Sequence, residues 1–358
     1  MSDGILGLMG LWRRLYRGET TFDFVGSRRR WWTISGVLLG VSILSLVIFG
    51  LELSVDFTGG LVVTIPNPAG AEVEDVREAI DPLGASDARI QLVSGGDSVR
   101  IQTGFTDDPA PLIEAASEVT GARPGEANVE SVGPTFGAQI GQRALIALVV
   151  FIGAVILYIG WRLEFKMGVT AIAALAHDLI VTVGIYALFG IDVTPATVVS
   201  ILTILGYSLY DSVVVFDQIK ENERELHDRA TYSDIVNLSM NQVLMRSINT
   251  SLASLIPIAS LLAIGGVILG ATPLNDFSLA LFIGIAVGTY SSIGVAGPLL
   301  AAWKEGEEGW MRTRRRLEVK EAAGARPVGP APSPAAPPSV RPPSGTGAAP
   351  RPPRKRKR

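Results

Sequence analysis

Six long stretches that carry almost no charged residue constrain this chain most. The first covers residues 33–51 and contains no Asp, Glu, Lys or Arg. A helix rises about 1.5 Å per residue, so about 20 apolar residues cross the hydrocarbon core of a membrane. We predict membrane spans at residues 33–51, 140–161, 167–191, 193–216, 247–268 and 277–303. The sequence therefore predicts a polytopic α-helical membrane protein with a six-helix transmembrane bundle.

The composition also argues against an ordinary soluble enzyme. Hydrophobic residues make up 48% of the 358 residues and charged residues only 18%, whereas soluble domains carry about 25% charged residues. The first stretch is longer than the h-region of a signal peptide, about 7–15 residues, so we expect it to remain in the mature protein. The sequence has no cysteine and no Gly-x-x-x-x-Gly-Lys-Ser/Thr phosphate loop. We therefore expect no ATP use, no cofactor, no metal site and no enzyme activity.

The charges separate by compartment. Residues 1–32 hold six Arg against three acids, and residues 304–358 hold 14 Lys and Arg against five acids. Residues 52–139 instead hold 15 acids and four Arg. Because cytoplasmic segments next to membrane helices are enriched in Lys and Arg, we expect both termini and the loop at residues 217–246 in the cytoplasm. Residues 52–139 should lie on the other side of the membrane.

The segment 52–139 is long enough to fold as a small domain. Its pattern predicts strands at 61–65, 88–93, 98–103 and 128–132, and helices at 71–83 and 108–119. A Ser-Gly-Gly-Asp turn at 94–97 favours a hairpin between the second and third strands. The resulting βαββαβ order is typical of a ferredoxin-like α+β fold.

The tail at 304–358 differs in composition from the rest of the chain. Its last 38 residues contain 11 of the 22 prolines and end with five basic residues. Such a segment buries too little apolar surface to offset its ordering entropy, so we expect disorder from about residue 321. Contact of the basic end with anionic lipid headgroups or ribosomal RNA is an alternative to a solvated tail that enforces orientation. We favour the solvated tail and expect no specific nucleic-acid partner.

Two acids lie inside predicted spans, where an ionisable residue costs about 2.5–3.5 kcal/mol and so needs a reason. Asp178 falls near the middle of the third span, and Thr182, one turn on, is placed to donate to its carboxylate. Asp211 falls in the fourth span with Ser208 on the same face. Arg246, at the cytoplasmic end of the fifth span, is the candidate counter-charge for Asp211. Further polar residues follow it at Asn249, Thr250 and Ser251.

The acids support two interpretations. A carboxyl that alternates between a charge-paired and a neutral form can move a proton, whereas a static buried pair only fixes helix packing. His177 adjoins Asp178 but should point about 100° away from it, so a packing role competes with a proton relay. A polar belt at residues 289–292 suits either hydrogen bonds between helices or a proton path. A Ser-His-Asp protease is disfavoured because no Gly-x-Ser-x-Gly motif occurs.

Small residues indicate where helices approach closely. Gly36 and Gly40 form one Gly-x-x-x-Gly pair in the first span, and Gly284 and Gly288 form another in the sixth. Such pairs let two helix backbones come together.

Several short motifs of the sequence resemble those of the SecF family of the bacterial protein-export system. They are Val55-Asp56-Phe57-Thr58-Gly59-Gly60, Ala176-His177-Asp178, the run 206–217 (GYSLYDSVVVFD), Glu221-Asn222 and Arg246-Ser247-Ile248-Asn249-Thr250-Ser251. With the lead-in at 22–26, the similarity covers about residues 22–303. Tyr210 departs from the pattern, because the family usually has Asn before the key Asp, and the Pro-rich tail lies outside it.

The resemblance implies a bundle of the resistance-nodulation-division type in the bacterial cytoplasmic membrane, with the α+β domain in the periplasm. It implies a heterodimer with SecD, association with the SecYEG channel, YajC as a candidate further partner, and a step that follows the ATPase SecA. The pair would use the proton-motive force to draw preproteins outward. On the matching positions Asp211 is tied to proton movement, Arg246 is its basic neighbour, and Asp178 and His177 have less defined roles. The alternatives are a proton-driven efflux transporter and a non-conducting assembly scaffold.

Overall fold

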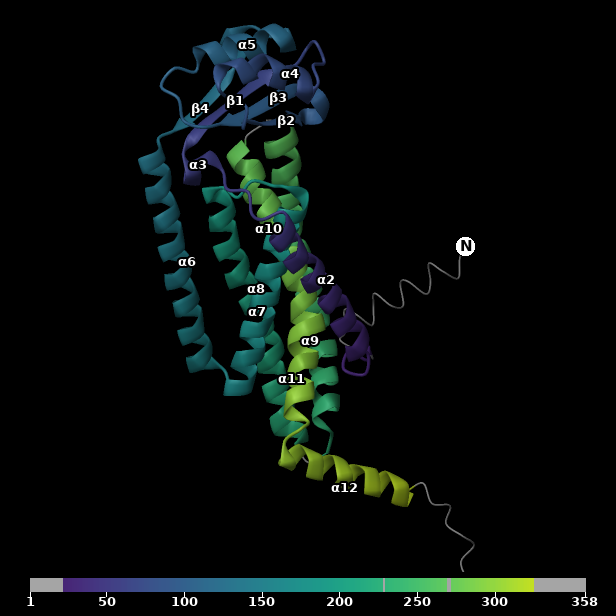
Figure 1. Ribbon diagram of the computed structural model, residues 1–358. Helices are drawn as coiled ribbons and strands as arrows, with labels where there is room; N and C mark the ends of the chain where they lie inside the picture. Colours follow the sequence, from purple (N-terminus) through teal and green to yellow (C-terminus); the bar gives the residue numbers. More distant parts are fainter. Residues whose placement is uncertain (1–21, 228, 269–271, 325–358) are drawn as a thin grey trace, which may run out of the picture. The chain divides into compact units, whose positions relative to one another are not determined.

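Six membrane-length helices, one small domain and a helix in the tail make up the described part of the chain. The computed structural model describes residues 22–227, 229–268 and 272–324. The first four long helices are α2 (Arg28–Ile48), α6 (Pro134–Arg162), α7 (Phe165–Phe189) and α8 (Pro195–Leu226). The fifth is α9 (Tyr232–Leu261), continued by the π-helix η4 (Leu262–Ile268), and the sixth runs through α10 (Thr272–Ser291), the π-helix η5 (Ser292–Ala296) and α11 (Gly297–Lys304) (Figure 1). All six are long and apolar enough to cross a membrane, so the predicted fold class is confirmed.

The predicted loop at 217–246 is mostly helical. Helix α8 continues to Leu226 and α9 already begins at Tyr232. Charged residues end a membrane span but not a helix, because Glu, Lys, Arg and Gln are good helix formers. Thr231 and Asp234 form a capping box at the start of α9, which satisfies free backbone N–H groups there.

The two ends of the chain fall largely outside the described residues. The basic residues 13, 14 and 17 and the Pro-rich segment 325–358 belong to these parts. The tail begins with the helix α12 (Glu308–Gly324). Residues 321–324, where we expected disorder to begin, are therefore helical.

The α+β domain contains one antiparallel sheet with two helices. Its elements are α3 (Val55–Thr58), β1 (Gly60–Pro66), α4 (Val73–Ile80), η1 (Asp81–Leu83), β2 (Arg89–Val93), η2 (Ser94–Gly96), β3 (Ser98–Thr103), α5 (Ala110–Thr120), η3 (Pro124–Glu126) and β4 (Asn128–Val132). The strand order is β2-β3-β1-β4, which confirms the ferredoxin-like βαββαβ prediction. Val63 lies opposite Ile101 in the register and both are fully buried, together with Val76 and Ile80 of α4. Burial of this apolar face holds the helices on the sheet.

Ionic contacts join this domain to the loop between α7 and α8. The Arg89 guanidinium on β2 donates to Asp192 Oδ1 at 2.8 Å and to the carbonyl oxygen of Gly190 at 2.8 Å. It also pairs with Glu52, and Arg100 on β3 lies 3.7 Å from Asp192. The domain therefore holds the connection between the two helices that carry Asp178 and Asp211.

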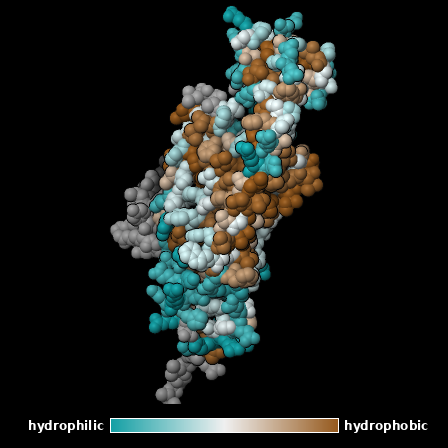
Figure 2. Space-filling model, turned by 90° about the vertical axis from the view of Figure 1, so that its left-hand side faces the viewer, coloured by the Kyte–Doolittle hydropathy of each residue, from teal (hydrophilic) through white to brown (hydrophobic). Residues whose placement is uncertain are grey.

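Small residues set the spacing of the bundle, but only one of the two Gly-x-x-x-Gly pairs does so. A Cβ at Gly284 would lie 2.1 Å from Ile204 Cδ1, and one at Gly288 would lie 3.2 Å from Ser208 Cβ, so α10 approaches α8 closely. Gly36 and Gly40 instead face open space, and α2 packs on α7 through Ser42, which meets Gly184. Hydrophobic side chains gather over the helices on the face shown in Figure 2, and hydrophilic ones lie at their ends.

Candidate functional site

Asp178 is fully buried beside hydroxyl groups from two neighbouring helices. Its Oδ2 accepts a hydrogen bond from Ser208 Oγ of α8 at 2.5 Å and another from Ser291 Oγ of α10 at 2.8 Å. His177 Nδ1 lies 3.2 Å from its Oδ1. Two seryl donors and one imidazole thus surround a carboxyl group at the centre of the bundle.

Asp211 occupies a matching environment. Its Oδ2 accepts from Ser247 Oγ of α9 at 2.6 Å and from Ser292 Oγ at 2.6 Å. The side chain is 5% exposed. In each case one carboxylate oxygen therefore receives two seryl donors from neighbouring helices.

The donors from the sixth span are consecutive residues. Ser291 ends α10 and Ser292 begins η5, so the junction of an α-helix and a π-helix lies at the site. Single-turn π-helices often occur at functional sites, where they change the direction of side chains. Gly288 faces the same site, because a Cβ there would lie in van der Waals contact with Asp178 Oδ2, at 3.6 Å, and more tightly against Ser208 Cβ, at 3.2 Å.

The arrangement can hold a carboxyl group with or without its proton. A serine hydroxyl both donates and accepts hydrogen bonds, so it can serve an ionised carboxylate or a protonated acid. Among the described residues neither acid forms an ion pair with Lys or Arg. The same part of the chain shows no cluster of His, Cys, Asp and Glu suited to a metal ion. Proton binding is the chemistry that these ligands support best.

Two sequence expectations around Asp178 are wrong. Thr182 does not donate to it, since Thr182 Oγ1 is buried without a hydrogen-bond partner in the described structure. His177, expected to point away from Asp178, contacts it through Nδ1 and also lies beside Tyr290 with ring centroids 6.0 Å apart. Ser208, expected on the same face of the fourth span as Asp211, donates to Asp178.

The expected ion pair between Asp211 and Arg246 is also wrong. The Arg246 guanidinium donates to the Tyr210 hydroxyl at 3.2 Å, while Asp211 bonds to the next residue, Ser247. Asp211 and Arg246 lie at similar depth, as predicted, because Asp211 bonds to the residue after Arg246. Neighbouring residues on a helix, however, point about 100° apart. One residue of difference turns Arg246 away from the buried acid.

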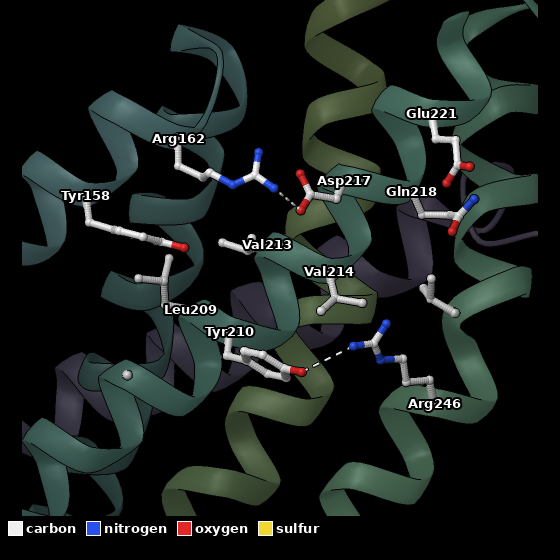
Figure 3. Close-up of a pocket in the computed structure, with 12 residues that line it drawn as sticks. Tyr158, Arg162, Leu209, Tyr210, Val213, Val214, Asp217, Gln218, Glu221 and Arg246 are labelled. Atoms are coloured by element: carbon white, nitrogen blue, oxygen red, sulfur yellow. Dashed lines mark hydrogen bonds and ion pairs between the residues drawn. The ribbon is translucent and has the colours of Figure 1, made fainter. Parts of the chain in front are cut away.

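Arg246 lines a cavity of about 630 Å³ between α6, α8 and α9. Figure 3 shows Arg246 and Tyr210 facing each other across it, with Arg162 of α6 directed to Asp217 of α8. The Arg162 to Asp217 distance is 2.6 Å. Tyr210 is 53% exposed, so this pair lies on an open face of the bundle.

Of the other predicted polar residues, one lies in the buried network near Asp211 and two lie outside it. Ser251 is buried and accepts from Thr289 Oγ1 at 2.8 Å. Within the described ranges the Thr250 side chain bonds only to its own helix, at Arg246 O and Ser247 O. Asn249 is exposed. Ser251 alone of the three therefore lies in the network near Asp211.

The segment 55–60 joins the α+β domain to α6. Val55, Asp56, Phe57 and Thr58 form α3, and Ser54 Oγ donates to Asp56 at 3.1 Å. Gly59 has φ 75°, and a Cβ there would lie 2.6 Å from Pro134 Cα at the start of α6. Gly60, with φ 147°, meets Thr103 O of β3. Only glycine fits these two positions, so this motif is a junction and lies apart from the buried acids.

Sequence reasoning missed Ser247, Ser291 and Ser292 as ligands of the acids. Ser291 and Ser292 were noticed within a polar belt, and Ser247 within the motif that follows Arg246. Their spacing does not say which helix they face, because that depends on how six helices are rotated against each other.

The fold and site define a class: a multi-pass membrane protein with two hydroxyl-bound acids at its centre and a ferredoxin-like domain between its first two spans. Residues 113–306 match the family described as Protein export membrane protein SecD/SecF, C-terminal. The chain is 43% identical to the protein translocase subunit SecF of Streptomyces coelicolor over 89% of its length and 86% of that protein. It is 40% identical to SecF of Mycobacterium tuberculosis over 90% of its length and 76% of that protein.

A solved structure supports the same family assignment. The crystal structure of SecDF, a translocon-associated membrane protein from Thermus thermophilus, superposes with a TM-score of 0.71 at 34% identity. The match covers 82% of this chain and 41% of the SecDF chain. The chain belongs to the SecD/SecF family, as a SecF-type protein translocase subunit.

Proposed function

We propose that this chain, paired with SecD, uses the proton-motive force to promote movement of preproteins across the bacterial cytoplasmic membrane. The observation that carries the proposal is the pair of buried acids, Asp178 and Asp211, each held by two serine hydroxyls and, among the described residues, without an ion pair to Lys or Arg. A proton that crosses a potential of about 100 mV releases about 2.3 kcal/mol. Protonation and deprotonation of these two acids couple that energy to the helices around them.

Helix rearrangement follows from the site's construction. Each acid is bound by hydroxyls of other helices, so a change of its charge changes the strength of contacts between α7, α8, α9 and the sixth span. Hydrogen bonds to a charged group contribute about 1.5–3 kcal/mol, roughly twice those between neutral groups. The ionic contacts of Arg89 and Arg100 with Asp192 give the α+β domain a link to that movement.

SecD is the partner that the relatives support best. The Thermus thermophilus protein is named SecDF and this chain matches 39% of it at 36% identity, as expected if SecD supplies the rest. The open cavity with Arg246 and Arg162 offers charged groups to such a partner inside the membrane. Within the wider assembly we propose the SecYEG channel, with YajC, as the neighbour and SecA as the ATPase that acts earlier.

The orientation follows the positive charges. We propose that both termini face the cytoplasm and that the α+β domain faces the periplasm. Arg28, Arg29 and Arg30 begin α2, and Arg312 and Arg314 lie in α12, at the ends of the first and last spans that we assign to the cytoplasm.

Replacement of Asp211 by Asn tests the function. The amide keeps the size and a hydrogen-bonding oxygen but cannot exchange a proton. Export that depends on the proton gradient should be lost in membrane vesicles, while insertion, SecD association and the start of translocation by SecA and ATP persist. Unchanged gradient-dependent export would favour an assembly scaffold instead.

A further inference from the structure

The sheet of the α+β domain ends on one side in an open strand. β4 is an edge of the sheet, since the strand order is β2-β3-β1-β4. Its first four residues are exposed, and within the described ranges its backbone bonds only to β1. Figure 1 shows β4 at the margin of the domain, beside the start of α6. An edge strand turns the N–H and C=O groups of every second residue away from the sheet, so β4 presents these groups to solvent.

β4 lacks the features with which proteins usually close such an edge, namely Lys or Pro residues, a β-bulge or a covering helix. The strand reads Asn-Val-Glu-Ser-Val, and its five pairs with β1 follow one another without a bulge. The opposite edge is different. Arg89 of β2 bonds to the α7–α8 loop, and the carbonyl oxygen of Ala88, just before β2, accepts from Arg77. β2 is therefore tied to the rest of the chain, whereas β4 is open.

The surroundings of β4 carry negative charge. Glu130 is exposed in the middle of the strand, and the exposed Glu126 lies in η3 just before it. The whole segment 52–139 holds 15 acids against four Arg. Val129 adds a small apolar surface, since it is 37% exposed on the face of the sheet that the helices cover, opposite the buried Val63. A peptide that pairs with β4 therefore meets an acidic environment, which favours basic segments.

This combination suits a transient partner that binds through its main chain. In β-strand addition the backbone hydrogen bonds of an extended peptide give the affinity. A permanent subunit interface is usually large and apolar, whereas five residues extend only about 17 Å and four of them are fully exposed here. An unfolded preprotein is extended and varies in sequence, so pairing with its main chain recognises it whatever its side chains are.

We propose that β4 binds extended basic segments of the translocating preprotein as an added strand, on the outer side of the membrane. This inference rests on the proposed export function and names the part of the substrate that the α+β domain holds. The membrane potential draws positive charges back toward the cytoplasm. Capture of basic segments at an acidic edge therefore opposes backward movement of the preprotein.

The position of β4 connects this binding with the bundle. Gly133 alone separates the strand from α6, which begins at Pro134. A Cβ at Gly59, next to the paired strand β1, would lie 2.6 Å from Pro134 Cα, and one at Gly137 of α6 would lie 2.7 Å from Gly59 N. The edge strand, its neighbour and the start of α6 thus meet in one closely packed junction. A force on a peptide bound to β4 therefore acts directly on α6.

Photocrosslinking tests the site in the full chain with SecD and SecYEG in membrane vesicles. Benzoylphenylalanine, a photoreactive amino acid, replaces Val129 on β4 or, as the matched control, Leu92 on β2. Leu92 is 44% exposed and lies opposite the buried Val99, so the two positions share the helix-covered face at opposite edges of one sheet. The probe is a preprotein arrested part-way by a folded C-terminal domain, with either a Lys-rich or a Glu-rich segment on the outer side.

Position 129 should crosslink to the Lys-rich preprotein about tenfold more than position 92, a ratio that one or two backbone hydrogen bonds account for. The Glu-rich segment should reduce crosslinking at position 129 to the level of the control. Equal crosslinking at the two positions would overturn the proposal. Equal crosslinking of the two preproteins, or crosslinking of position 129 to SecD in place of preprotein, would overturn it as well.

Hydrogen exchange tests whether the main chain pairs. Exchange at residues 128–132 should slow when the Lys-rich preprotein is arrested, because outward N–H groups gain partners, while residues 89–93 of β2 should not change. Val129→Lys introduces the residue with which natural edge strands prevent pairing. It should abolish the protection and lower gradient-dependent export, whereas Leu92→Lys should do neither. Unchanged exchange at β4 in the presence of preprotein would contradict strand addition.

The two proposals fail separately, because crosslinking to an arrested preprotein needs no proton gradient and can be repeated in Asp211→Asn. If Asp211→Asn loses gradient-dependent export while position 129 crosslinks no preprotein, strand capture is wrong and the proton function stands. If Asp211→Asn exports normally while position 129 crosslinks the preprotein, the proton function is wrong and β4 keeps its role in binding.

Discussion

Ser291 and Ser292 are consecutive residues, yet the first donates to Asp178 at 2.8 Å and the second to Asp211 at 2.6 Å. The two acids lie on different helices, so one short stretch of backbone at the α10–η5 junction bonds to both. A shift of this junction alters both environments at once. This gives the two acids a direct physical means of influencing each other.

Ser292→Ala should impair the site more than the loss of an ordinary buried hydroxyl. Asp211 would keep only the Ser247 donor, and loss of a hydrogen bond to a charged group costs about 1.5–3 kcal/mol. We expect lower thermal stability in detergent and weaker gradient-dependent export. Ser278→Ala is the matched control, because Ser278 is also fully buried in the sixth span but bonds to its own helix at Leu274 O. Equal behaviour of the two variants would contradict the role of Ser292.

Tyr210→Phe should release Arg246 without unfolding the bundle. The phenol is the acceptor that holds the guanidinium, at 3.2 Å on an exposed face, so the cost in stability should be below about 1 kcal/mol. Export should fall severalfold if Arg246 must be held there, and Tyr210→Asn, the residue that the family usually has, should restore it. Full activity of the Phe variant would show that the contact has no part in export.

Acid should loosen the segment that precedes α2. The pKa of Asp23 is lowered by the hydrogen bond from the Asn237 side chain and by that from the Gly26 backbone N–H. A carboxyl whose pKa is lower in the folded state stabilises it above the unfolded pKa, about 3.9, and loses this effect as the pH falls through the folded value.

Asp23→Asn should therefore weaken the attachment at neutral pH and remove its acid dependence. Limited proteolysis near residue 22, followed from neutral to acidic pH, measures this. Asp87→Asn, in the α+β domain, serves as the control. Acid sensitivity that persists in Asp23→Asn would assign the effect to another group.

Arg89→Ala should loosen the α+β domain from the α7–α8 loop. The side chain is 27% exposed and bonds to Asp192, Glu52 and Gly190 O, so we expect a loss of about 1–2 kcal/mol, between an exposed ion pair and a buried charged hydrogen bond. Thermal unfolding and hydrogen exchange at residues 190–193 report it. Arg123→Ala, at an exposed position of the same domain, should change neither; the same change in both variants would argue against a specific contact.

The sequence predicted the positions of helices and strands better than it predicted which way their side chains point. Strands at 98–103 and 128–132 and the helices of the bundle follow from hydrophobic period and charge-free length, which are local properties. The contact of Asp211 with Ser247 rather than Arg246 depends on the rotation of α9 about its axis, which no local pattern encodes. Helix α8 likewise continues past the predicted membrane boundary because its charged residues favour helix as well as water.

The central claim is that Asp211 gains and loses a proton inside the membrane. Infrared difference spectroscopy of the SecD complex in lipid, recorded with and without an imposed proton gradient, measures the carbonyl stretch of a protonated carboxyl directly. We predict a gradient-dependent band that disappears in Asp211→Asn and shifts in Ser292→Ala, which removes one of its donors. A spectrum without a gradient-dependent carboxyl band, or one in which the band is unchanged by Asp211→Asn, would contradict the account.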